Sequence, residues 1–502
     1  MKILTSEQVR EADAYTIKNE PIKSINLMER AAGQLYREFI RNFTKSHPVD
    51  IYAGPGNNGG DGIALSRMLS LKGYRVNLYI METGRGLSGD PEINYKRLPE
   101  IKNLSVGWLS NKNHLPRHET NSIIVDALFG SGLDRPLEGY PARLVEHINK
   151  APNVKISVDI PSGLFAESNP DPSDTAIIMA DHTWCFQFPK LSFLMPENEK
   201  YVGEWKYLDI GLHKGFIDNC DTPYHYLTIE TIKKILHKRA RFSHKGHFGH
   251  AFLIAGGRGK LGASVLSAEA CLRSGAGLLT VHTPTIGMEV LQTALPEAML
   301  SIDPNLDVIG TMPDVNPYTA IGAGPGLGTS KKTADSIRQL LEINRPMVLD
   351  ADVLNILSQD KTLVDKIPHG TIITPHPGEY NRLYGHDSDH FSRLMRMRDI
   401  SRGQKIVIVL KGANTAIADT EGNIWFNSTG NPGMATGGSG DVLTGIILSL
   451  LTQGYDPLEA ALAGVFIHGL AGDLARDEKG EESLIAGDII EWLPDAFKIC
   501  KK

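Results

Sequence analysis

The chain has 502 residues, of which 41% are hydrophobic and 22% charged, and its formal net charge is -6. Because domains commonly hold roughly 100 to 200 residues, this length exceeds one ordinary hydrophobic core, and we expect two large domains. The negative charge offers no attraction to nucleic acid or to an anionic membrane, so we expect neither as a partner.

The first half of the chain predicts two helices followed by a parallel sheet. Thr5 or Ser6 can cap a first helix, and apolar residues recur at helical spacing over residues 27–43 to give a second. Short apolar runs then alternate with helical or glycine-rich stretches, which is typical of a parallel sheet covered on both faces. The expected strands are residues 49–53, 75–80, 122–126, 155–159 and 181–188.

A polar connection with a short basic helix, residues 211–243, separates this set from a second one, and we place the domain boundary there. The expected domains are residues 1–215 and 226–502. In the second, the expected strands are 251–255, 278–282, 320–322, 346–350, 371–374 and 406–410, and the expected helices are 262–274, 331–341, 442–451 and 457–475. Alternation of this kind predicts the α/β class in both domains, with ligands beyond the carboxyl ends of the strands.

The cysteines and the N-terminus indicate the compartment. Cys185, Cys220, Cys271 and Cys500 form no CxxC pair and have no metal-binding spacing, so we expect reduced thiols in a cytoplasmic protein. Residues 1–7 turn polar at once, and we expect no stretch that approaches the roughly 18 apolar residues of a membrane span. We expect a homo-oligomer, whose order the sequence leaves open.

The first glycine-rich motif is Gly54-Pro55-Gly56-Asn57-Asn58-Gly59-Gly60-Asp61-Gly62, which follows a predicted strand and opens a helix. It fits the GxGxxG pattern of dinucleotide folds, and Glu82 lies near the expected ribose-binding distance, so a dehydrogenase is one interpretation. However, Asp61 would place a negative charge where that fold binds pyrophosphate. Asn57 and Asn58 add amide oxygens, which suit a cation or a hydroxylated ligand.

Two further strand ends bring similar groups to the same edge of the sheet. Asp126 lies in the segment VDALFGSG, and Asp159 lies in VDIPSG. Each aspartate alone could merely cap a helix or loop, but three strand ends with oxygen donors favour a binding site. Lys190 lies just past the next strand and could reach the same crevice, although an isolated lysine is usually a surface charge.

These three motifs resemble those of the YjeF N-terminal family, the NAD(P)H-hydrate epimerases, over residues 1–215. The resemblance implies a three-layer, Rossmann-like domain and a potassium ion bound by Asn58, Asp126 and Ser162. It implies that the hydrated nucleotide is held by Asn57, Asn58, Gly59, Gly60, Asp61, Gly130, Ser131, Gly132, Leu133, Asp134, Arg135, Pro136 and Asp159. Epimerisation requires the hydroxyl-bearing carbon to open or lose water and to reclose on its other face. One acid–base group suffices in principle, and we expect it to be Asp159.

Residues 431–444 of the second half join a glycine-rich turn, one carboxylate and the start of an apolar helix. Successive glycines leave backbone N–H groups free to bind an anion, and the helix adds the positive end of its dipole. A carboxylate is unfavourable beside phosphates unless it has a task, so Asp441 is predicted to take the proton of an attacking hydroxyl. The alternative is that Asp441 only caps the helix.

Other loops of this half also follow predicted strands: Gly256-Gly257 with Arg258 and Lys260, residues 324–328, residues 374–379 and residues 410–415. With Asp441 they resemble the ADP-dependent NAD(P)H-hydrate dehydratases, a ribokinase-like family of three-layer αβα domains, from Tyr226 to the C-terminus. By position, Ala263, Gly326, His376 and Asp441 would contact the hydrated nucleotide. The residues implied to hold ADP or AMP are Lys411, Gly412, Ala413, Asn414, Thr415 and Gly440.

Joined, the two halves resemble the bifunctional NAD(P)H-hydrate repair family, which implies hydrated NADH and NADPH as substrates. The first domain would interconvert their R and S epimers, and the second would dehydrate the S epimer and turn ADP into AMP and phosphate. Because hydroxide is a poor leaving group, the implied mechanism phosphorylates the hydroxyl and then expels phosphate, with Mg²⁺ sharing the stabilisation of charge. The sequence does not separate ADP from ATP as donor, and ADP is our expectation.

One alternative remains open at this point. The second half could be a small-molecule kinase, because ribokinase-like domains share the glycine-rich turn and a fold does not fix a function. In that interpretation the first half is a nucleotide-binding module without catalytic activity.

Overall fold

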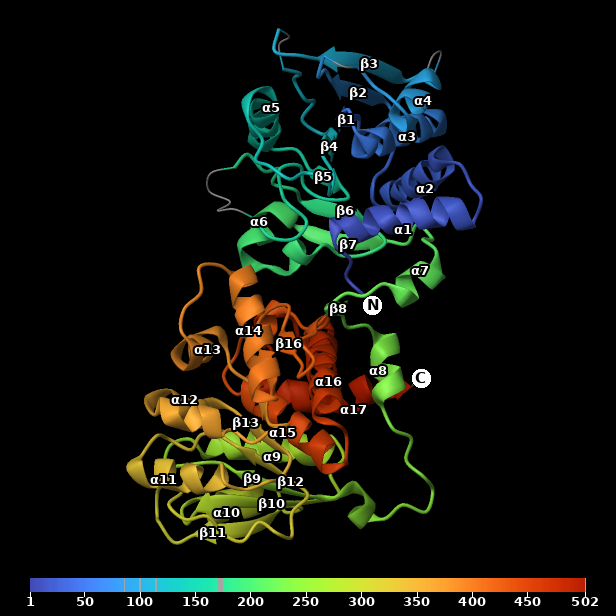
Figure 1. Cartoon of the computed structure of the whole chain (residues 1–502). Coiled ribbons are helices and arrows are strands. Elements are labelled where there is room, and N and C mark those ends of the chain that lie inside the picture. Colours follow the sequence, from blue (N-terminus) through green and yellow to red (C-terminus); the bar gives the residue numbers. More distant parts are fainter. Residues whose placement is uncertain (85, 99–100, 113–114, 170–174, 502) are drawn as a thin grey trace. The chain divides into compact units, whose positions relative to one another are not determined.

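The computed structural model describes residues 1–84, 86–98, 101–112, 115–169 and 175–501. The chain divides into two compact units, one of Lys2–Thr222 and one of Pro223–Lys502 together with Met1 (Figure 1). Met1 belongs to the second unit because its backbone exchanges hydrogen bonds with the backbone of Tyr226. Each unit has its own sheet, as expected for the α/β class.

The first unit contains a seven-stranded parallel sheet of order β3-β2-β1-β4-β5-β6-β7. Its strands are β1 (Val49–Ala53), β2 (Val76–Met81), β3 (Leu104–Leu109), β4 (Ile123–Ala127), β5 (Lys155–Val158), β6 (His182–Phe186) and β7 (Glu204–Leu208). The helices described here are α1 (Ser6–Asn19), α2 (Ser24–Asn42), α3 (Asn57–Lys72), α4 (Asp90–Lys96), α5 (Gly139–Lys150), α6 (Glu199–Val202) and α7 (Lys214–Asn219). The direction of chain progression reverses between β1 and β4, where open α/β sheets bind ligands.

Alternation along the strands builds a core on each face of this sheet. Ile51 packs with α2 and α3, whereas the next residue, Tyr52, packs with α5 on the opposite face. Residues of a strand point alternately to the two faces, so a strand covered on both sides is apolar throughout. This explains why β1 and β4 are buried along their whole length, and it confirms the strands expected there.

The turn from β1 into α3 depends on glycines. A Cβ at Gly54 would lie 1.8 Å from the carbonyl oxygen of Leu128, and one at Gly59 would lie 1.9 Å from that of Gly54. Neither position has room for a side chain, so the backbones of α3, of the turn before it and of the segment after β4 are in direct contact. This close approach fixes where α3 begins.

The second unit contains a ten-stranded sheet of order β11-β10-β9-β12-β13-β14-β15-β16-β17-β8. Its strands are β8 (Tyr224–Tyr226), β9 (His250–Ile254), β10 (Leu278–Pro284), β11 (Met299–Asp303), β12 (Ala320–Ala323), β13 (Met347–Leu349), β14 (Ile372–Ile373), β15 (Val407–Leu410), β16 (Ala416–Ala418) and β17 (Ile424–Phe426). Neighbouring strands are parallel except β15 with β16 and β16 with β17, which are antiparallel.

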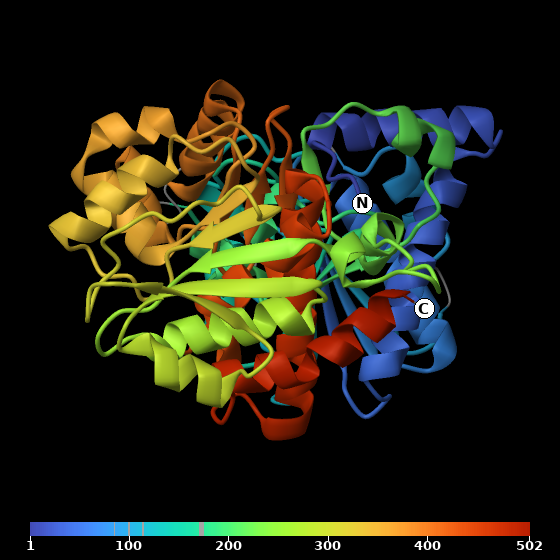
Figure 2. The ribbon, with the colours of Figure 1, turned by 90° about the horizontal axis from the view of Figure 1, so that it is seen from below.

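The helices of the second unit are α8 (Ile229–Ile235), α9 (Leu261–Arg273), α10 (Gly287–Ala294), α11 (Lys331–Leu340), α12 (Ala351–Gln359), α13 (Pro377–Tyr384), α14 (His390–Gln404), α15 (Ser439–Thr452), α16 (Pro457–Lys479) and α17 (Ala486–Lys501). Residues of α9, α15, α16 and α17 share one hydrophobic core with the strands. Figure 2 shows the red C-terminal helices, residues 457–501, apart from the yellow and orange helices of residues 331–404.

Helix α16 corrects one expectation from the sequence. By length and composition it could cross a membrane, since its most apolar 18-residue window has a mean hydropathy of 1.4. Within the fold, 72% of that window is buried. It packs against α15 and α17, as a core helix does. A helix enclosed by other elements in this way can be apolar on every side without entering a membrane.

Candidate functional site

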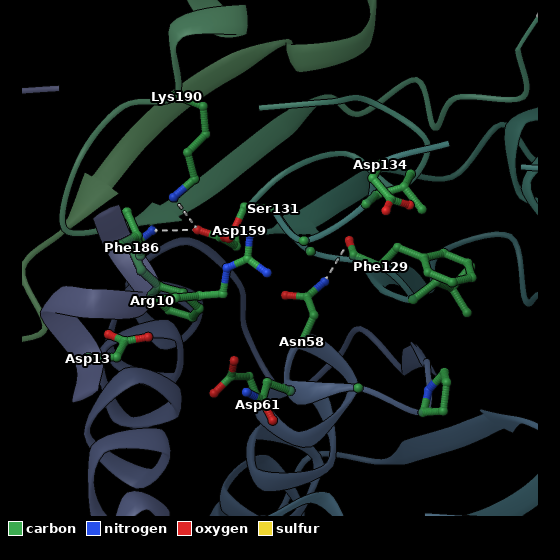
Figure 3. A pocket seen from close by; sticks show the side chains of 18 of the residues that line it. Arg10, Asp13, Asn58, Asp61, Phe129, Ser131, Asp134, Asp159, Phe186 and Lys190 are labelled. Atoms are coloured by element: carbon green, nitrogen blue, oxygen red, sulfur yellow. Dashed lines mark hydrogen bonds and ion pairs between the residues drawn. The ribbon is translucent and has the colours of Figure 1, made fainter. Parts of the chain in front are cut away.

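The first unit contains a cavity of about 820 Å³ at the carboxyl ends of its strands (Figure 3). The walls come from α1, the turn after β1, residues 128–138 after β4, Asp159 after β5 and residues 186–190 after β6. Most of the residues expected to bind the hydrated nucleotide line it, namely Asn57, Asn58, Asp61, Gly130, Ser131, Gly132, Leu133, Asp134, Arg135, Pro136 and Asp159. Gly59 and Gly60 do not, because they are buried within α3.

Oxygen atoms gather at one wall of this cavity. Asn58 Nδ2 donates to the carbonyl of Phe129 at 3.0 Å, while Asn58 Oδ1 is buried and has no hydrogen-bond partner. Ser162 and Asp126 are fully buried behind the lining residues. Ser162 Oγ lies 2.6 Å from Asp126 Oδ1 and 3.2 Å from the Phe129 carbonyl oxygen. Burial raises the pKa of Asp126 despite the hydrogen bonds from Ser162, as expected for a carboxylate that lacks a counter-charge. The three residues expected to bind potassium therefore lie together.

Asp159 and Lys190 form a buried ion pair beside that wall. Lys190 Nζ lies 2.8 Å from Asp159 Oδ1, and the two side chains are only 3% and 11% exposed. Burial would lower the pKa of Lys190, but the charge of Asp159 raises it above its ordinary value. The carboxylate also accepts a hydrogen bond from the backbone N–H of Phe186 at 3.2 Å. Lys190 is therefore not the surface charge that an isolated lysine usually is.

Two more carboxylates border the cavity, and the pKa of each is raised. Burial and the nearby Asp159 raise the pKa of Asp61 well above its ordinary value. The same causes raise the pKa of Asp13, on α1, to about 6. Asp13 and its neighbour Arg10 were not found by sequence reasoning, because α1 carries no recognisable motif; both line the cavity.

In the second unit, Asp441 lies in the first turn of α15. The N-cap is Gly438, with φ +92 and no side-chain capping bond, so Asp441 is not the cap of this helix. The first N–H groups of α15 thus have no side-chain acceptor at the cap and can bind an anion. Burial, followed by the charge of Asp350, raises the pKa of Asp441 to about 6. Such a carboxyl can gain and lose a proton near neutral pH.

Lys411 connects the predicted nucleotide loop to this helix. Its Nζ lies 2.8 Å from Asp350 Oδ1 and 4.0 Å from Glu379 Oε2, and Thr444 of α15 donates to Asp350 Oδ2 at 2.8 Å. A Cβ at Gly440 would lie 3.4 Å from Lys411 Nζ, so these two predicted ADP-binding residues are neighbours. Asp350, at the end of β13, was not predicted. The sequence does contain a sign of it, since Asp350 stands at the end of a predicted strand, as Asp126 and Asp159 do.

The remaining members of the predicted nucleotide loop lie between β15 and β16. Thr415 closes this loop, because its Oγ1 accepts from the N–H of Gly412 at 3.2 Å and donates to the Gly412 carbonyl at 3.0 Å. Gly412 and Ala413 are exposed, and Asn414 is half-buried. The loop is therefore closed by its own hydrogen bonds and presents its tip to solvent.

The structure also places the other residues predicted to contact the hydrated nucleotide. Gly326, at φ +65, approaches α9 so closely that its Cβ would lie 3.2 Å from the Cβ of Ala263. His376 caps α13, where its Nδ1 accepts hydrogen bonds from the N–H groups of Gly378 and Glu379. Half of the His376 side chain remains exposed. Its ring is thus positioned by the helix that it caps.

Charge around Asp441 is predominantly acidic. Burial raises the pKa of Glu379, and Asp352 is paired with Lys260 at 3.1 Å. Behind the glycine turn, half-buried His468 has a pKa lowered by desolvation to about 4 and contacts the carbonyl oxygen of Ser439 at 3.0 Å. No group of three or more His, Cys, Asp or Glu with metal-binding geometry occurs in the part of the chain that the structure describes. The site therefore combines several carboxylates, Asp441 among them, with a glycine turn whose N–H groups can bind an anion.

Comparison with known proteins assigns both units. Residues 24–192 match the family described as YjeF-related protein N-terminus, and residues 251–495 match NAD(P)H-hydrate dehydratase. A bifunctional NAD(P)H-hydrate repair enzyme of Moorella thermoacetica is 33% identical over 98% of this chain and 96% of its own length. Another, of Coxiella burnetii, is 34% identical over 97% of this chain and 98% of its own.

A solved structure is similar to the second unit. It is an ADP/ATP-dependent NAD(P)H-hydrate dehydratase of Bacillus subtilis, co-crystallised with ATP and Mg²⁺. The two share 33% sequence identity with a TM-score of 0.50, over 55% of this chain and 98% of that one. Together with the full-length relatives, these matches show that the chain belongs to the family of bifunctional NAD(P)H-hydrate repair enzymes.

Proposed function

We propose that this chain repairs hydrated NADH and NADPH at two sites, one in each unit. Residues 1–215 form the epimerase domain, which interconverts the R and S hydrates, and residues 226–502 form the dehydratase domain, which returns the S hydrate to NAD(P)H. The observation that carries the proposal is the pair of separate carboxylate sites, around Asp159 and Asp441, in a chain that matches bifunctional repair enzymes along nearly its whole length.

At the epimerase site, the hydrated nucleotide occupies the 820 Å³ cavity and contacts the residues of the three motifs. Asp159 acts as the acid–base group of the reaction at the carbon that carries the hydroxyl, and Lys190 Nζ holds its carboxylate in place by an ion pair. The unpartnered oxygen of Asn58 and the buried carboxylate of Asp126 fit a potassium ion, which Ser162 would also help to hold. When bound, such an ion supplies positive charge that offsets the substrate phosphates.

At the dehydratase site, Asp441 accepts the proton of the substrate hydroxyl as that oxygen attacks the terminal phosphoryl group of ADP. The N–H groups at the start of α15 and the ammonium of Lys411 stabilise the charge of the transferred group. Phosphate then leaves with the electron pair of its C–O bond, and loss of a proton from the neighbouring ring carbon restores the nicotinamide double bond. Because the O–H proton is removed by a carboxylate with a pKa of about 6, this step needs no stronger base.

The acidic surroundings of Lys411 fit a divalent cation. Asp350 and Glu379 both lie within 4.0 Å of one ammonium, so the cluster carries more negative than positive charge before Asp441 is counted. Mg²⁺ usually binds one or two carboxylates together with substrate phosphates. Asp350 and Glu379 would help to hold it, and it would neutralise charge on the phosphates of ADP. The free state of all four cysteines supports a cytoplasmic location, and we propose a homo-oligomer of unspecified order.

The test follows each hydrate separately. Purified protein is mixed with either epimer of hydrated NADH, with ADP or ATP in parallel, and the absorbance of the restored reduced nicotinamide is recorded. Consumption of both epimers is the expected result, with faster turnover in the ADP arm. Consumption of the S epimer alone would remove the epimerase assignment, and the absence of recovery with either donor would favour a kinase.

A further inference from the structure

The epimerase cavity contains a carboxylate that belongs to none of the sequence motifs. Asp13 lies on α1, a helix held at its start by a capping box between Thr5 and Gln8. Asp13 lies four residues after Val9 and three after Arg10, and all three line the cavity, so this face of α1 forms one of its walls. One turn further along the helix, buried Thr16 accepts a hydrogen bond from the N–H of His213 at 2.9 Å, which anchors the C-terminal half of α1.

The carboxylate of Asp13 is free to act on a ligand. No described residue donates a hydrogen bond to it or forms an ion pair with it, although it is half-buried. Figure 3 shows it on the same side of the cavity as Asp61, with Lys190 and Asp159 on the opposite wall. The charged and titratable groups that surround it are Arg10 from α1, Asp61 from α3, Asp159 after β5 and Lys190 after β6.

Three carboxylates around one cavity thus have three different environments. Asp159 forms an ion pair with the ammonium of Lys190 at 2.8 Å. Burial, followed by the charge of Asp159, raises the pKa of Asp61 well above its ordinary value. Asp13 is intermediate, with a pKa raised to about 6 by burial and by the charge of Asp159. Pairs of acids with separated pKa values are how one site supplies both a proton donor and a proton acceptor.

We propose that Asp13 is a second catalytic residue of the epimerase site, the proton donor to the departing hydroxyl group, working opposite Asp159. This inference rests on the proposed epimerase function and adds a donor to the single acid–base group that the reaction formally requires.

The step balances as follows. The Asp13 carboxyl gives its proton to the hydroxyl oxygen of the substrate, the C–O bond breaks with its electron pair on that oxygen, and water leaves. The lone pair of the adjacent ring nitrogen forms a C=N⁺ bond to the same carbon. A water molecule then adds to the other face, the C=N⁺ electron pair returns to nitrogen, and the proton released by that water passes to Asp159. One proton thus moves from Asp13 to Asp159 in one direction and back in the other.

The experiment measures epimerisation directly in the full-length chain. Pure R hydrate of NADH is incubated without any adenine nucleotide, so that the dehydratase site is idle, and the two epimers are separated by chromatography against an enzyme-free control. Three variants are compared with the wild type: Asp13→Asn, Asp13→Glu and Glu11→Gln. Glu11 is exposed on the same helix and does not line the cavity, so its variant controls for changes in α1.

We expect Asp13→Asn to reduce kcat by about 10² to 10⁴, the usual contribution of a general acid. In the wild type, kcat/KM should fall as the pH rises through about 6, where Asp13 loses its proton, and Asp13→Asn should lack this limb. Asp13→Glu should retain the limb at a shifted pH, and Glu11→Gln should match the wild type.

An Asp13→Asn rate within a factor of three of the wild type would overturn the proposal, and so would a slow variant that keeps the same pH limb. If Asp13→Asn fails to fold, the pH profile of Asp13→Glu is the deciding measurement. If its kcat/KM falls at the same pH as in the wild type, Asp13 is not the donor. A wild-type protein that does not epimerise the hydrate would instead refute the proposed function of the first unit, which separates the two failures.

Discussion

The buried pair of Lys190 and Asp159 gives a quantitative test of how the epimerase site is held together. Replacing Lys190 by Met keeps most of the side-chain volume but leaves the carboxylate of Asp159 buried without a counter-charge. Removing one member of a buried ion pair costs about 3 to 5 kcal/mol, because the remaining charge has lost its partner and stays out of water. With side chains 3% and 11% exposed at 2.8 Å, this pair belongs to that class.

A matched control is available in the same unit. Lys96 pairs with Glu92 at 2.6 Å on α4, but the two side chains are 71% and 42% exposed. Exposed pairs contribute about 0 to 1 kcal/mol because water already solvates both charges. We therefore expect Lys96→Met to be nearly neutral, whereas Lys190→Met destabilises the first unit strongly.

Native-state hydrogen exchange can assign the effect to one unit of a two-unit chain. The slowest amides of β4 and β5 report the opening of the first sheet, and a loss of 3 to 5 kcal/mol corresponds to exchange about 10² to 10⁴ times faster. Asp159→Asn in the Lys190→Met background removes the unpaired charge, and we expect it to recover at least half of the loss. A Lys190→Met effect no larger than that of Lys96→Met, or no recovery in the double variant, would show that the pair does not hold the site by charge.

Three further predictions concern the two sites. Asp441→Asn should lower the rate of dehydration about 10² to 10⁴-fold while epimerisation continues. Chromatography of both epimers with ADP present measures the two rates, and a normal dehydration rate would show that Asp441 is not the base. Because a base must be ionised and the pKa of Asp441 is about 6, dehydration in the wild type should fall as the pH drops through that value and level off above it, which a pH profile of kcat/KM will show. Asn58→Ala, which removes the unpartnered amide oxygen, should abolish the difference in thermal unfolding of the first unit between potassium and choline buffers, and a protein whose unfolding never depended on potassium would contradict the proposed ion site.

The central strands of both sheets could be predicted from the sequence because they are buried on both faces and read as continuous apolar runs. Strands β3 and β11 at the sheet edges were missed, since their residues are largely exposed or half-buried and leave no such run. The three-residue strands β16 and β17 were missed as well, because they are too short for a periodic pattern. These segments are strands because they pair with neighbouring strands, and that pairing cannot be read from the sequence.

The residues of the candidate sites also differ in whether the sequence could predict them. Asp159 and Asp441 stand beside glycines at the ends of predicted strands or turns, so local sequence identifies them. Asp350 carries a similar signal, but its role became clear only with Lys411 at 2.8 Å and Thr444 beside it. Asp13 has no local signal at all, because its position in the cavity depends on where the whole of α1 packs. Residues brought in by tertiary packing alone are beyond motif reasoning.

The tight packing of main chain against main chain at Gly54 and Gly59 has a consequence for how the epimerase site responds to ligands. Since the Leu128 carbonyl sits where a side chain of Gly54 would be, any displacement of the segment after β4 must push on α3 and hence on Asn58. Binding of the nucleotide and binding of the ion would then affect each other through main-chain atoms, which remain when a side chain is truncated. Replacing the lining side chains by alanine would leave this linkage intact, whereas alanine at Gly54 or Gly59 would add a Cβ where there is no room and would disturb it.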